Sequence, residues 1–184
     1  EAAAADIARS AGETPEVRVV DLSLLSSIRS FTSEFLRDHP ELDILVNNAG
    51  TWSVKREETS EGREKVWATN QLAYFLVTEE LRPALLRVPE ARIVSVASRL
   101  ARDLDLDDVE FKKRRYRGVD AYAQSKQANR MWTRAIARRF AGTKVTANSM
   151  HPGGVATGLF GKGGSLLGSL VGAAASLVGR TPAQ

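Results

Sequence analysis

The sequence lacks cysteine altogether and has only two histidines, His39 and His151, among its 184 residues. Disulfide bonds and thiolate chemistry are therefore excluded, and the composition is compatible with a reducing compartment. With so few imidazole groups, a metal site built on histidine is not expected either. Any chemistry of this chain must come from hydroxyl, amide, carboxylate or amine groups.

The sequence also lacks a long uninterrupted apolar run. Its most apolar stretch, residues 165–179, is broken by glycine and serine and is shorter than the ~20 residues that a transmembrane helix requires. No signal peptide is recognised at the start of the sequence. We therefore expect no transmembrane span and predict a cytoplasmic location, with peripheral membrane association left open.

Basic residues outnumber acidic ones, which gives a net charge of +4 and an isoelectric point near 9.6. The basic residues concentrate in two stretches, 111–118 and 130–140. Such stretches can attract nucleic acid or an anionic surface. No nucleic-acid-binding motif accompanies them, so we interpret them as a solvated loop and a solvated helix face. No nucleic-acid partner is predicted.

The length and a hydrophobic share of 43% predict a single domain with a sizeable core. Short apolar runs alternate with longer amphipathic ones. We predict strands at 17–21, 42–46, 92–97 and 144–150, and helices at 23–38, 60–86 and 121–141, with Ser23 and Ser60 as amino-terminal caps. This alternation predicts an α/β fold with a parallel sheet covered on both faces.

Ligands of such parallel sheets bind at the carboxyl ends of the strands. The residues in these positions are Asp21, residues 47–50, Ser98 and residues 151–157. All of these positions are small, polar or able to expose the backbone. They predict a binding site at that edge of the sheet.

One tyrosine and one lysine, Tyr122 and Lys126, stand four residues apart in the helix expected at 121–141. Residues at this spacing share a helix face and can touch. An ammonium beside a phenol favours the phenolate and lowers the tyrosine pKa from ~10, so the group can exchange protons near neutral pH. Taken alone, the pair is also explained by a surface contact, so the interpretation depends on the other motifs of the sequence.

The motifs follow one order along the chain, which is Asp21 after a strand, Asn-Asn-Ala-Gly at 47–50, Asn70, Ser98, Tyr122 with Lys126, and Pro-Gly-Gly-Val-Ala-Thr at 152–157. This ordered set resembles the short-chain dehydrogenase/reductase family. Tyr122 lies 24 positions after Ser98, and this spacing resembles the retinol-dehydrogenase-like branch, as does Ala-Tyr-Ala-Gln-Ser-Lys at 121–126. The resemblance implies an incomplete, doubly wound, Rossmann-like sheet in three αβα layers. It also implies hydride transfer between an alcohol or carbonyl and NAD or NADP.

The resemblance assigns catalytic roles to Tyr122, Lys126, Ser98 and Asn70. Tyr122 would be the general acid/base, Lys126 would lower its pKa and bind the nicotinamide ribose, and Ser98 would hold the substrate oxygen. Asn70 falls on an apolar helix stripe, where an unpaired amide costs about 1–3 kcal/mol. It is either a satisfied core asparagine or a residue that distorts the helix so that water reaches Lys126. The family uses its counterpart as such a proton relay.

The same resemblance implies the cofactor contacts. Asp21 would bond the adenine amino group, and Gly50, which can take positive φ, would let the backbone approach the adenosine half. The turn at 152–153 would lie under the nicotinamide, whose carboxamide the Val155 amide and the Thr157 hydroxyl would hold. The expected cofactor-binding residues are Asp21, Asn47, Asn48, Ala49, Gly50, Tyr122, Lys126, Pro152, Gly153, Val155 and Thr157.

The glycine-rich turn that marks a dinucleotide-binding strand and helix is not found in the sequence. We therefore expect residues 1–184 to form a single partial NAD(P)-binding domain, an internal fragment in which cofactor binding is weak. The residue that distinguishes NAD from NADP is not identifiable. The alternative hypothesis is a truncated, non-catalytic module that acts through protein contacts.

The apolar segment 158–180 follows the expected nicotinamide loop, where the family places its substrate lid. Its leucines and valines favour a bulky apolar substrate, such as a retinoid, a lipid aldehyde or a steroid, but packing or a partner contact explains them equally well. The family commonly uses helices such as those at 60–86 and 121–141 for subunit contacts. We therefore predict a homo-oligomer with Trp67 and Trp132 as contact residues.

Overall fold

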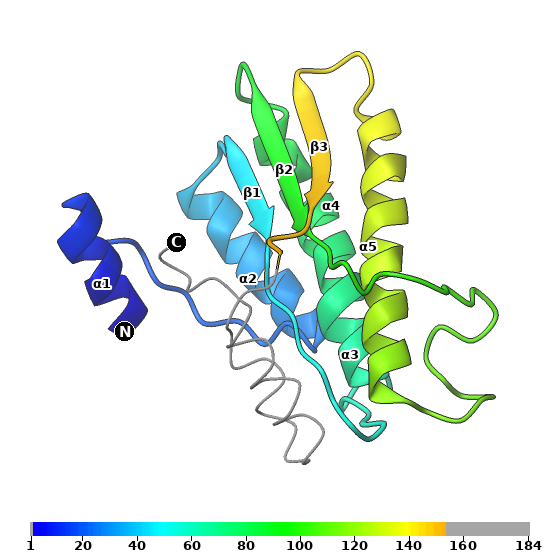
Figure 1. Cartoon of the computed structure of the whole chain (residues 1–184). Coiled ribbons are helices and arrows are strands. Elements are labelled where there is room, and N and C mark those ends of the chain that lie inside the picture. The colour runs from blue at the N-terminus through cyan, green and yellow to red at the C-terminus, as the bar shows by residue number, and fades with distance from the viewer. Residues whose placement is uncertain (1, 154–184) are drawn as a thin grey trace.

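The computed structural model describes residues 2–153, in which helices and strands alternate (Figure 1). The elements are helix α1 (Ala2–Ala11), α2 (Leu25–Asp38), β1 (Ile44–Asn47), α3 (Lys65–Trp67), the π-helical segment η1 (Ala68–Leu72), α4 (Ala73–Leu85), β2 (Ala91–Val96), α5 (Gly118–Arg139) and β3 (Val145–Met150). Each of the later strands is therefore reached from the previous strand through a helix, which is the connection that parallel strands require.

The three strands form one parallel sheet in the order β1-β2-β3. In its register, Leu45 of β1 lies beside Ile93 of β2, which lies beside Ala147 of β3. The expected Rossmann-like α/β fold is confirmed. Three of the four expected strands are also confirmed, with ends that differ from the prediction by no more than two residues.

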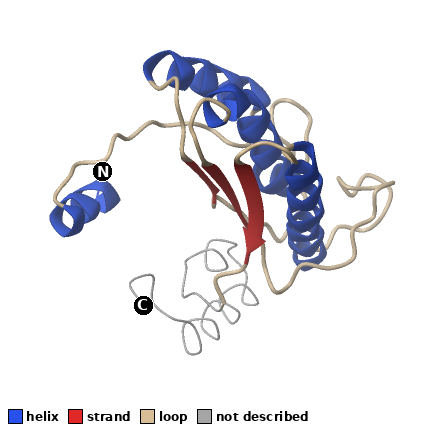
Figure 2. Ribbon diagram, turned by 90° about the horizontal axis from the view of Figure 1, so that it is seen from above, coloured by secondary structure: helices blue, strands red, loops and turns tan. Residues whose placement is uncertain are grey.

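Helices α2, α4 and α5 all lie on one face of the sheet (Figures 1 and 2). Apolar side chains between this face and the helices form clusters around Ile93 and around Ile28, and Leu45 packs against both. Side chains alternate along a strand, so Ile44 and Val46 point to the opposite face and are 58% and 54% exposed. The second helix layer of the expected αβα arrangement is not among the described residues.

The strand expected at 17–21 is wrong. This segment has no regular structure, and its apolar residues Val17 and Val19 are 59% and 97% exposed. The Arg18 guanidinium pairs with Asp38 at the end of α2 at 2.7 Å, but no described strand lies beside the segment to complete a ladder. Helix α1, which precedes it, stands away from the sheet in both views (Figures 1 and 2).

The beginning of α2 is capped by a residue distant in the sequence. The Glu61 carboxylate accepts hydrogen bonds from the backbone N–H groups of Leu25 at 2.7 Å and Ser26 at 3.0 Å. The expected cap, Ser23, instead donates its backbone N–H and its hydroxyl to the Asp21 carboxylate. The prediction of Ser23 as the cap is therefore wrong, because a carboxylate from another loop satisfies the helix end.

The helix expected from Ser60 begins later, at Lys65. The Glu64 carboxylate accepts hydrogen bonds from the N–H groups of Val66 at 2.9 Å and Trp67 at 2.6 Å, whereas Ser60 lies in the preceding turn. Glu64 is 1% exposed, and burial raises its pKa more than the hydrogen bonds lower it. The prediction of Ser60 as the cap is wrong, since a buried glutamate has this role.

Candidate active site

Ser98 and Tyr122 meet just beyond the carboxyl end of β2. Ser98 follows the strand by two residues, and Tyr122 lies near the start of α5. A hydrogen bond joins the two side chains, and Tyr122 is 6% exposed. The structure thus brings together the two hydroxyl groups that the sequence assigns to one site, while their catalytic roles stay a prediction.

Burial raises the pKa of Tyr122 above its ordinary value of 10.0, and the hydrogen bond with Ser98 lowers it only in part. The expected lowering of this pKa by Lys126 is not found among the described residues. The Lys126 Nζ lies 5.9 Å from the Tyr122 ring centroid, and burial lowers the lysine pKa to about 8. The prediction was wrong on this point because both groups are removed from water, which favours the neutral form of each.

Lys126 is 3% exposed and is anchored to the sheet. Its Nζ donates a hydrogen bond to the backbone oxygen of Val96, the last residue of β2, at 2.9 Å. The same nitrogen lies 5.2 Å from the ring centroid of Tyr74. An ammonium has three N–H donors, so two of them have no acceptor within the described part of the chain.

Asn70 lies in η1, a π-helical segment between α3 and α4. Its side chain is fully buried and makes three hydrogen bonds. Oδ1 accepts from the Thr51 N–H at 2.7 Å, and Nδ2 donates to the Thr51 oxygen and to Ser125 Oγ, each at 3.0 Å. The hydrogen-bonding groups of the amide are therefore satisfied, and the helix is also distorted at this residue. π-helical segments of this kind are frequent at functional sites. Access of water to Lys126 stays a prediction.

The loop after β1 passes over Lys126 and Asn70. A Cβ atom at Gly50 would lie 3.5 Å from Lys126 Nζ and 3.6 Å from Asn70 Oδ1. The Tyr74 hydroxyl donates to the backbone oxygen of Ala49 at 2.9 Å and holds the loop in place. Gly50 does not use the positive φ that glycine can take, because the described glycines with positive φ lie elsewhere. The two distances are those of ordinary contacts, so a Cβ atom at this position would fit beside the two polar side chains.

Two of the expected cofactor ligands make contacts that stabilise the fold. Asn47 is 6% exposed, and its Nδ2 donates to Thr78 Oγ1 of α4 at 3.1 Å, which joins the end of β1 to a helix. Asp21 accepts both hydrogen bonds from Ser23, which hold its pKa below the ordinary value. Of the two adjacent asparagines, Asn48 is exposed, and its side chain is therefore accessible to a ligand.

The residues after β3 are described only in part. Pro152 and Gly153 are exposed, and a single residue, His151, separates them from the end of β3. Gly153 has φ of +83°, a conformation that costs glycine little. Val155, Thr157 and the proposed lid at 158–180 lie outside the described residues.

Ser125 belongs to the site but was not singled out in the sequence. It is fully buried, its Oγ accepts from Asn70 Nδ2 at 3.0 Å, and its hydroxyl donates to the Tyr122 backbone oxygen at 2.8 Å. It therefore connects η1 to α5 between two proposed catalytic residues. A small polar residue between Tyr122 and Lys126 was a visible signal, but periodicity does not reveal a partner in another helix.

The start of α5 approaches the loop after β1 so closely that only glycine fits. A Cβ atom at Gly118 would lie 2.1 Å from the backbone oxygen of Ser53 and 3.3 Å from the ring of Trp52. Gly118 is one helical turn before Tyr122, so this close contact helps to fix the position of the tyrosine. Nothing in the sequence pattern indicates such a contact.

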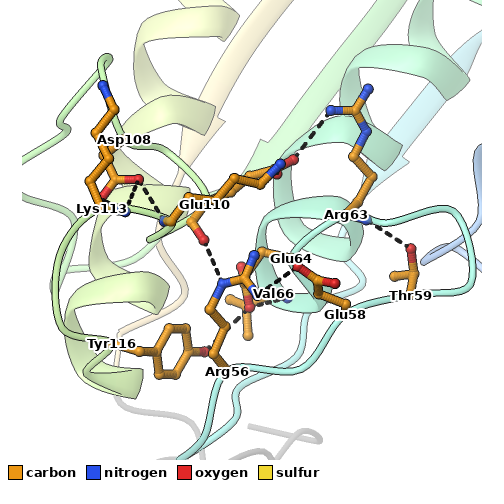
Figure 3. Close-up of polar contacts among 11 residues, drawn as sticks. Arg56, Glu58, Thr59, Arg63, Glu64, Val66, Asp108, Glu110, Lys113 and Tyr116 are labelled. Carbon is orange, nitrogen blue, oxygen red and sulfur yellow. Dashed lines mark hydrogen bonds and ion pairs between the residues drawn. The ribbon is translucent and has the colours of Figure 1, made fainter.

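The segment between β2 and α5 is fastened by its acidic and aromatic residues (Figure 3). The Asp108 carboxylate accepts hydrogen bonds from the backbone N–H groups of residues 112–114, the shortest at 2.6 Å. The Tyr116 hydroxyl donates to Glu64 Oε1 at 3.3 Å and so reaches the cap of α3. This long segment is therefore ordered against the elements that carry Asn70 and Tyr122.

Within residues 2–153, no group of three or more histidine, cysteine, aspartate or glutamate side chains is placed to hold a metal ion. No helix in this part of the chain is long and apolar enough to cross a bilayer. The functional groups that gather at the ends of β1 and β2 are those of Tyr122, Ser98, Lys126 and Asn70.

Residues 1–165 match the family model described as short chain dehydrogenase, and the chain belongs to this family. Among solved structures, it is similar to a putative NAD(P)-dependent gluconate 5-dehydrogenase from Beutenbergia cavernae, with 29% identity and a TM-score of 0.70 over 97% of this chain and 69% of that one. It is also similar to a protein from Mycobacterium paratuberculosis, with 36% identity and a TM-score of 0.70 over 81% and 54% of the two chains.

Two human retinol dehydrogenases are among the most similar curated relatives. Human retinol dehydrogenase 14 is 41% identical over 145 residues, which are 78% of this chain and 43% of that protein. Human retinol dehydrogenase 13 is 37% identical over 159 residues, which are 83% and 47% of the two. The expected resemblance to the retinol-dehydrogenase-like branch is confirmed. The chain spans less than half the length of these relatives.

Proposed function

We propose that this chain carries the active site of an NAD(P)-dependent oxidoreductase that interconverts an alcohol and a carbonyl. The observation that carries the proposal is the cluster at the carboxyl ends of β1 and β2. In it, the Tyr122 side chain is hydrogen-bonded to Ser98, and Lys126 lies one turn further along α5. Asn70 is joined to this helix through Ser125. Membership of the family and the similarity to proteins named retinol dehydrogenases support the same activity.

Tyr122 is the general acid/base in this proposal. Its hydroxyl gives a proton to the carbonyl oxygen during reduction, and the phenolate takes a proton from the alcohol during oxidation. Ser98 holds the same oxygen and stabilises the negative charge that develops on it. Because burial raises the pKa of Tyr122, the residue is protonated near neutral pH and is ready to act as an acid.

The cofactor in this proposal is NADP or NAD. The structure from Beutenbergia cavernae has bound NADP, and a putative short chain dehydrogenase from Escherichia coli with 25% identity is complexed with NADPH. The described residues fit a dinucleotide at two points. Lys126 has two N–H groups left for ribose hydroxyls, and Gly50 adds no side chain of its own to the exposed loop after β1. The bound nicotinamide would supply or accept the hydride.

We infer that the substrate is a small-molecule alcohol or carbonyl compound with a bulky apolar body. The names of the retinol dehydrogenase relatives support a retinoid-like compound. A cytoplasmic location and a homo-oligomer belong to the same proposal. Trp67 and Trp132 stay the proposed contact residues; both are half-buried, and Trp132 packs in part against the apolar cluster around Ile93.

The alternative proposal is a non-catalytic module that acts through protein contacts. Ile44 and Val46 favour it, because they expose apolar surface on the face of the sheet that no described helix covers. Titration with NADPH and with NADH, followed by nicotinamide fluorescence, distinguishes the two proposals. Saturable binding that is lost in Lys126→Met supports the oxidoreductase. Binding of neither cofactor, together with capture of a partner that Val46→Glu prevents, supports the module.

A further inference from the structure

A cavity of about 400 Å³ lies outside the candidate active site. It is bounded by the beginning of α2, by α3, η1 and the start of α4, and by residues 106–113 of the segment before α5. None of the four proposed catalytic residues lines it. η1 takes part in both sites, since Leu72 lines the cavity whereas Asn70 binds Thr51 and Ser125.

The walls of this cavity are mainly apolar. Leu25, Trp67, Leu72 and Leu76 contribute to them, and Leu106 lies at the mouth with 72% of its surface exposed. A ligand that covers such side chains gains roughly 25 cal/mol for each Å² of apolar surface removed from water. The volume is within the ~300–1,000 Å³ that is usual for small-molecule sites. The cavity therefore suits a compact or folded apolar body.

The two buried carboxylates of the cavity already have partners. Asp108 is held by the backbone N–H groups of residues 112–114. Glu110 faces two cations, with Arg63 Nη1 at 3.4 Å and Lys112 Nζ at 2.9 Å (Figure 3 shows Arg63 and Glu110). Because one carboxylate faces two positive groups, positive charge is left over beside the cavity.

The exposed charges at the mouth are also mostly positive. The side chains of Arg63 and Lys112 are 48% and 58% exposed, and the ammonium of Lys113 has no ion pair within the described part of the chain. Asp107 is the exposed carboxylate among the lining residues and opposes them in part. An apolar cavity with a cationic mouth recognises an apolar body that ends in an anionic group.

We propose that this cavity binds a carboxylate amphiphile of the fatty-acid type. The hydrocarbon lies along Trp67 and Leu72, and the carboxylate lies at the mouth beside Lys113. The site is distinct from the proposed active site, and its existence does not depend on the proposed function. It is also connected to α5, because the buried Gln124 side chain donates to the backbone oxygen of Val109, a lining residue, at 2.7 Å.

The apolar part of the proposal is tested by calorimetric titration of the 184-residue chain with dodecanoate below its micellar concentration. We expect saturable binding of one molecule, and Leu106→Glu should weaken it at least ~10-fold by placing a charge at the mouth. Leu106 is exposed, so the fold should not be affected. Met131→Glu on α5 and Val46→Glu on the uncovered sheet face are matched controls, at 47% and 54% exposure, and should bind normally.

The charged part is tested by comparing dodecanoate with neutral dodecanol. Lys113→Glu should lower the affinity for dodecanoate about fivefold, as expected for loss of an exposed ion pair. The affinity for dodecanol should change by less than about twofold. Arg134→Glu, an exposed charge reversal away from the cavity, should change neither. An equal loss of both ligands in Lys113→Glu would contradict an anionic headgroup at the mouth.

Three further results would overturn the proposal. The first is no saturable binding of dodecanoate. The second is a loss of binding in Val46→Glu but not in Leu106→Glu, which would place the ligand on the uncovered sheet face. The third is a dimer in sedimentation that Leu106→Glu dissociates while dodecanoate does not, which would make a second copy the occupant.

Discussion

Replacement of Asn70 by alanine removes three hydrogen bonds from the centre of the candidate site. The Asn70 side chain holds the Thr51 N–H at 2.7 Å, the Thr51 oxygen at 3.0 Å and Ser125 Oγ at 3.0 Å, and it is fully buried. Asn70 has no solvent-accessible surface in the described part of the chain. The polar groups of Thr51 and Ser125 would therefore lose a partner without a solvent replacement.

The expected cost is obtained by counting these contacts. A buried hydrogen bond contributes about 1 kcal/mol net, and leaving its partner unsatisfied adds to the cost, so Asn70→Ala should lower the free energy of unfolding by about 3 kcal/mol. Ser125→Ala removes one of the three Asn70 contacts and should cost about 1 kcal/mol. Because the two side chains touch, the double variant should cost less than the sum of the two single variants.

The assay is urea unfolding followed by circular dichroism. Asn148→Ala is the matched control, since Asn148 is an exposed asparagine on β3, and it should change the free energy of unfolding by less than about 0.5 kcal/mol. An Asn70→Ala variant as stable as this control would refute the reasoning. So would strict additivity with Ser125→Ala, because it would mean that the two side chains are not coupled.

Three other predictions follow from the same structure. Gly118→Ala should lower the free energy of unfolding by about 1–3 kcal/mol in urea, because the new Cβ would lie 2.1 Å from a backbone oxygen. Gly50→Ala, whose Cβ makes ordinary contacts, is the control and should stay within about 0.5 kcal/mol. Burial lowers the pKa of Lys126 from 10.5 to about 8, so the folded chain loses this proton at a lower pH than the unfolded chain does. The free energy of unfolding should therefore rise with pH between these two values. Lys126→Met should lack that rise, and an equal pH dependence would contradict the burial. In fluorescence titrations the 184-residue chain should bind NADPH only weakly, since its sequence has no glycine-rich turn for the pyrophosphate; tight binding would show that such a turn is dispensable.

The sequence was sufficient for those parts of the fold that depend on local pattern. The strands at 42–46, 92–97 and 144–150 are apolar runs between amphipathic helices, and each is present in the sheet. The segment 17–21 has the same pattern and forms no strand, because a strand exists only where a neighbour completes its hydrogen bonds. The local pattern indicates the tendency to form a strand, but it does not show whether a neighbouring strand is present.

The parts of the site that were not predicted depend on contacts between distant residues. Glu61 caps α2 from another loop, and Gly118 is required only because Ser53 lies against it. Ser125 has its partner Asn70 in another helix. The pKa of Tyr122 was predicted in the wrong direction for the described chain, because spacing along a helix contains no information on burial. Each of these features arises only when the elements pack together.

The central claim is that Tyr122 exchanges the proton in an alcohol–carbonyl reaction. The direct test grafts the 145 matched residues into human retinol dehydrogenase 14 and measures NADPH-dependent reduction of retinal. Tyr122→Phe should lower turnover at least ~100-fold with little change in NADPH affinity, as expected for loss of a general acid. Tyr116→Phe removes a hydroxyl that binds Glu64 and is the matched control, which should keep its turnover. Turnover by Tyr122→Phe equal to that of Tyr116→Phe would contradict the claim.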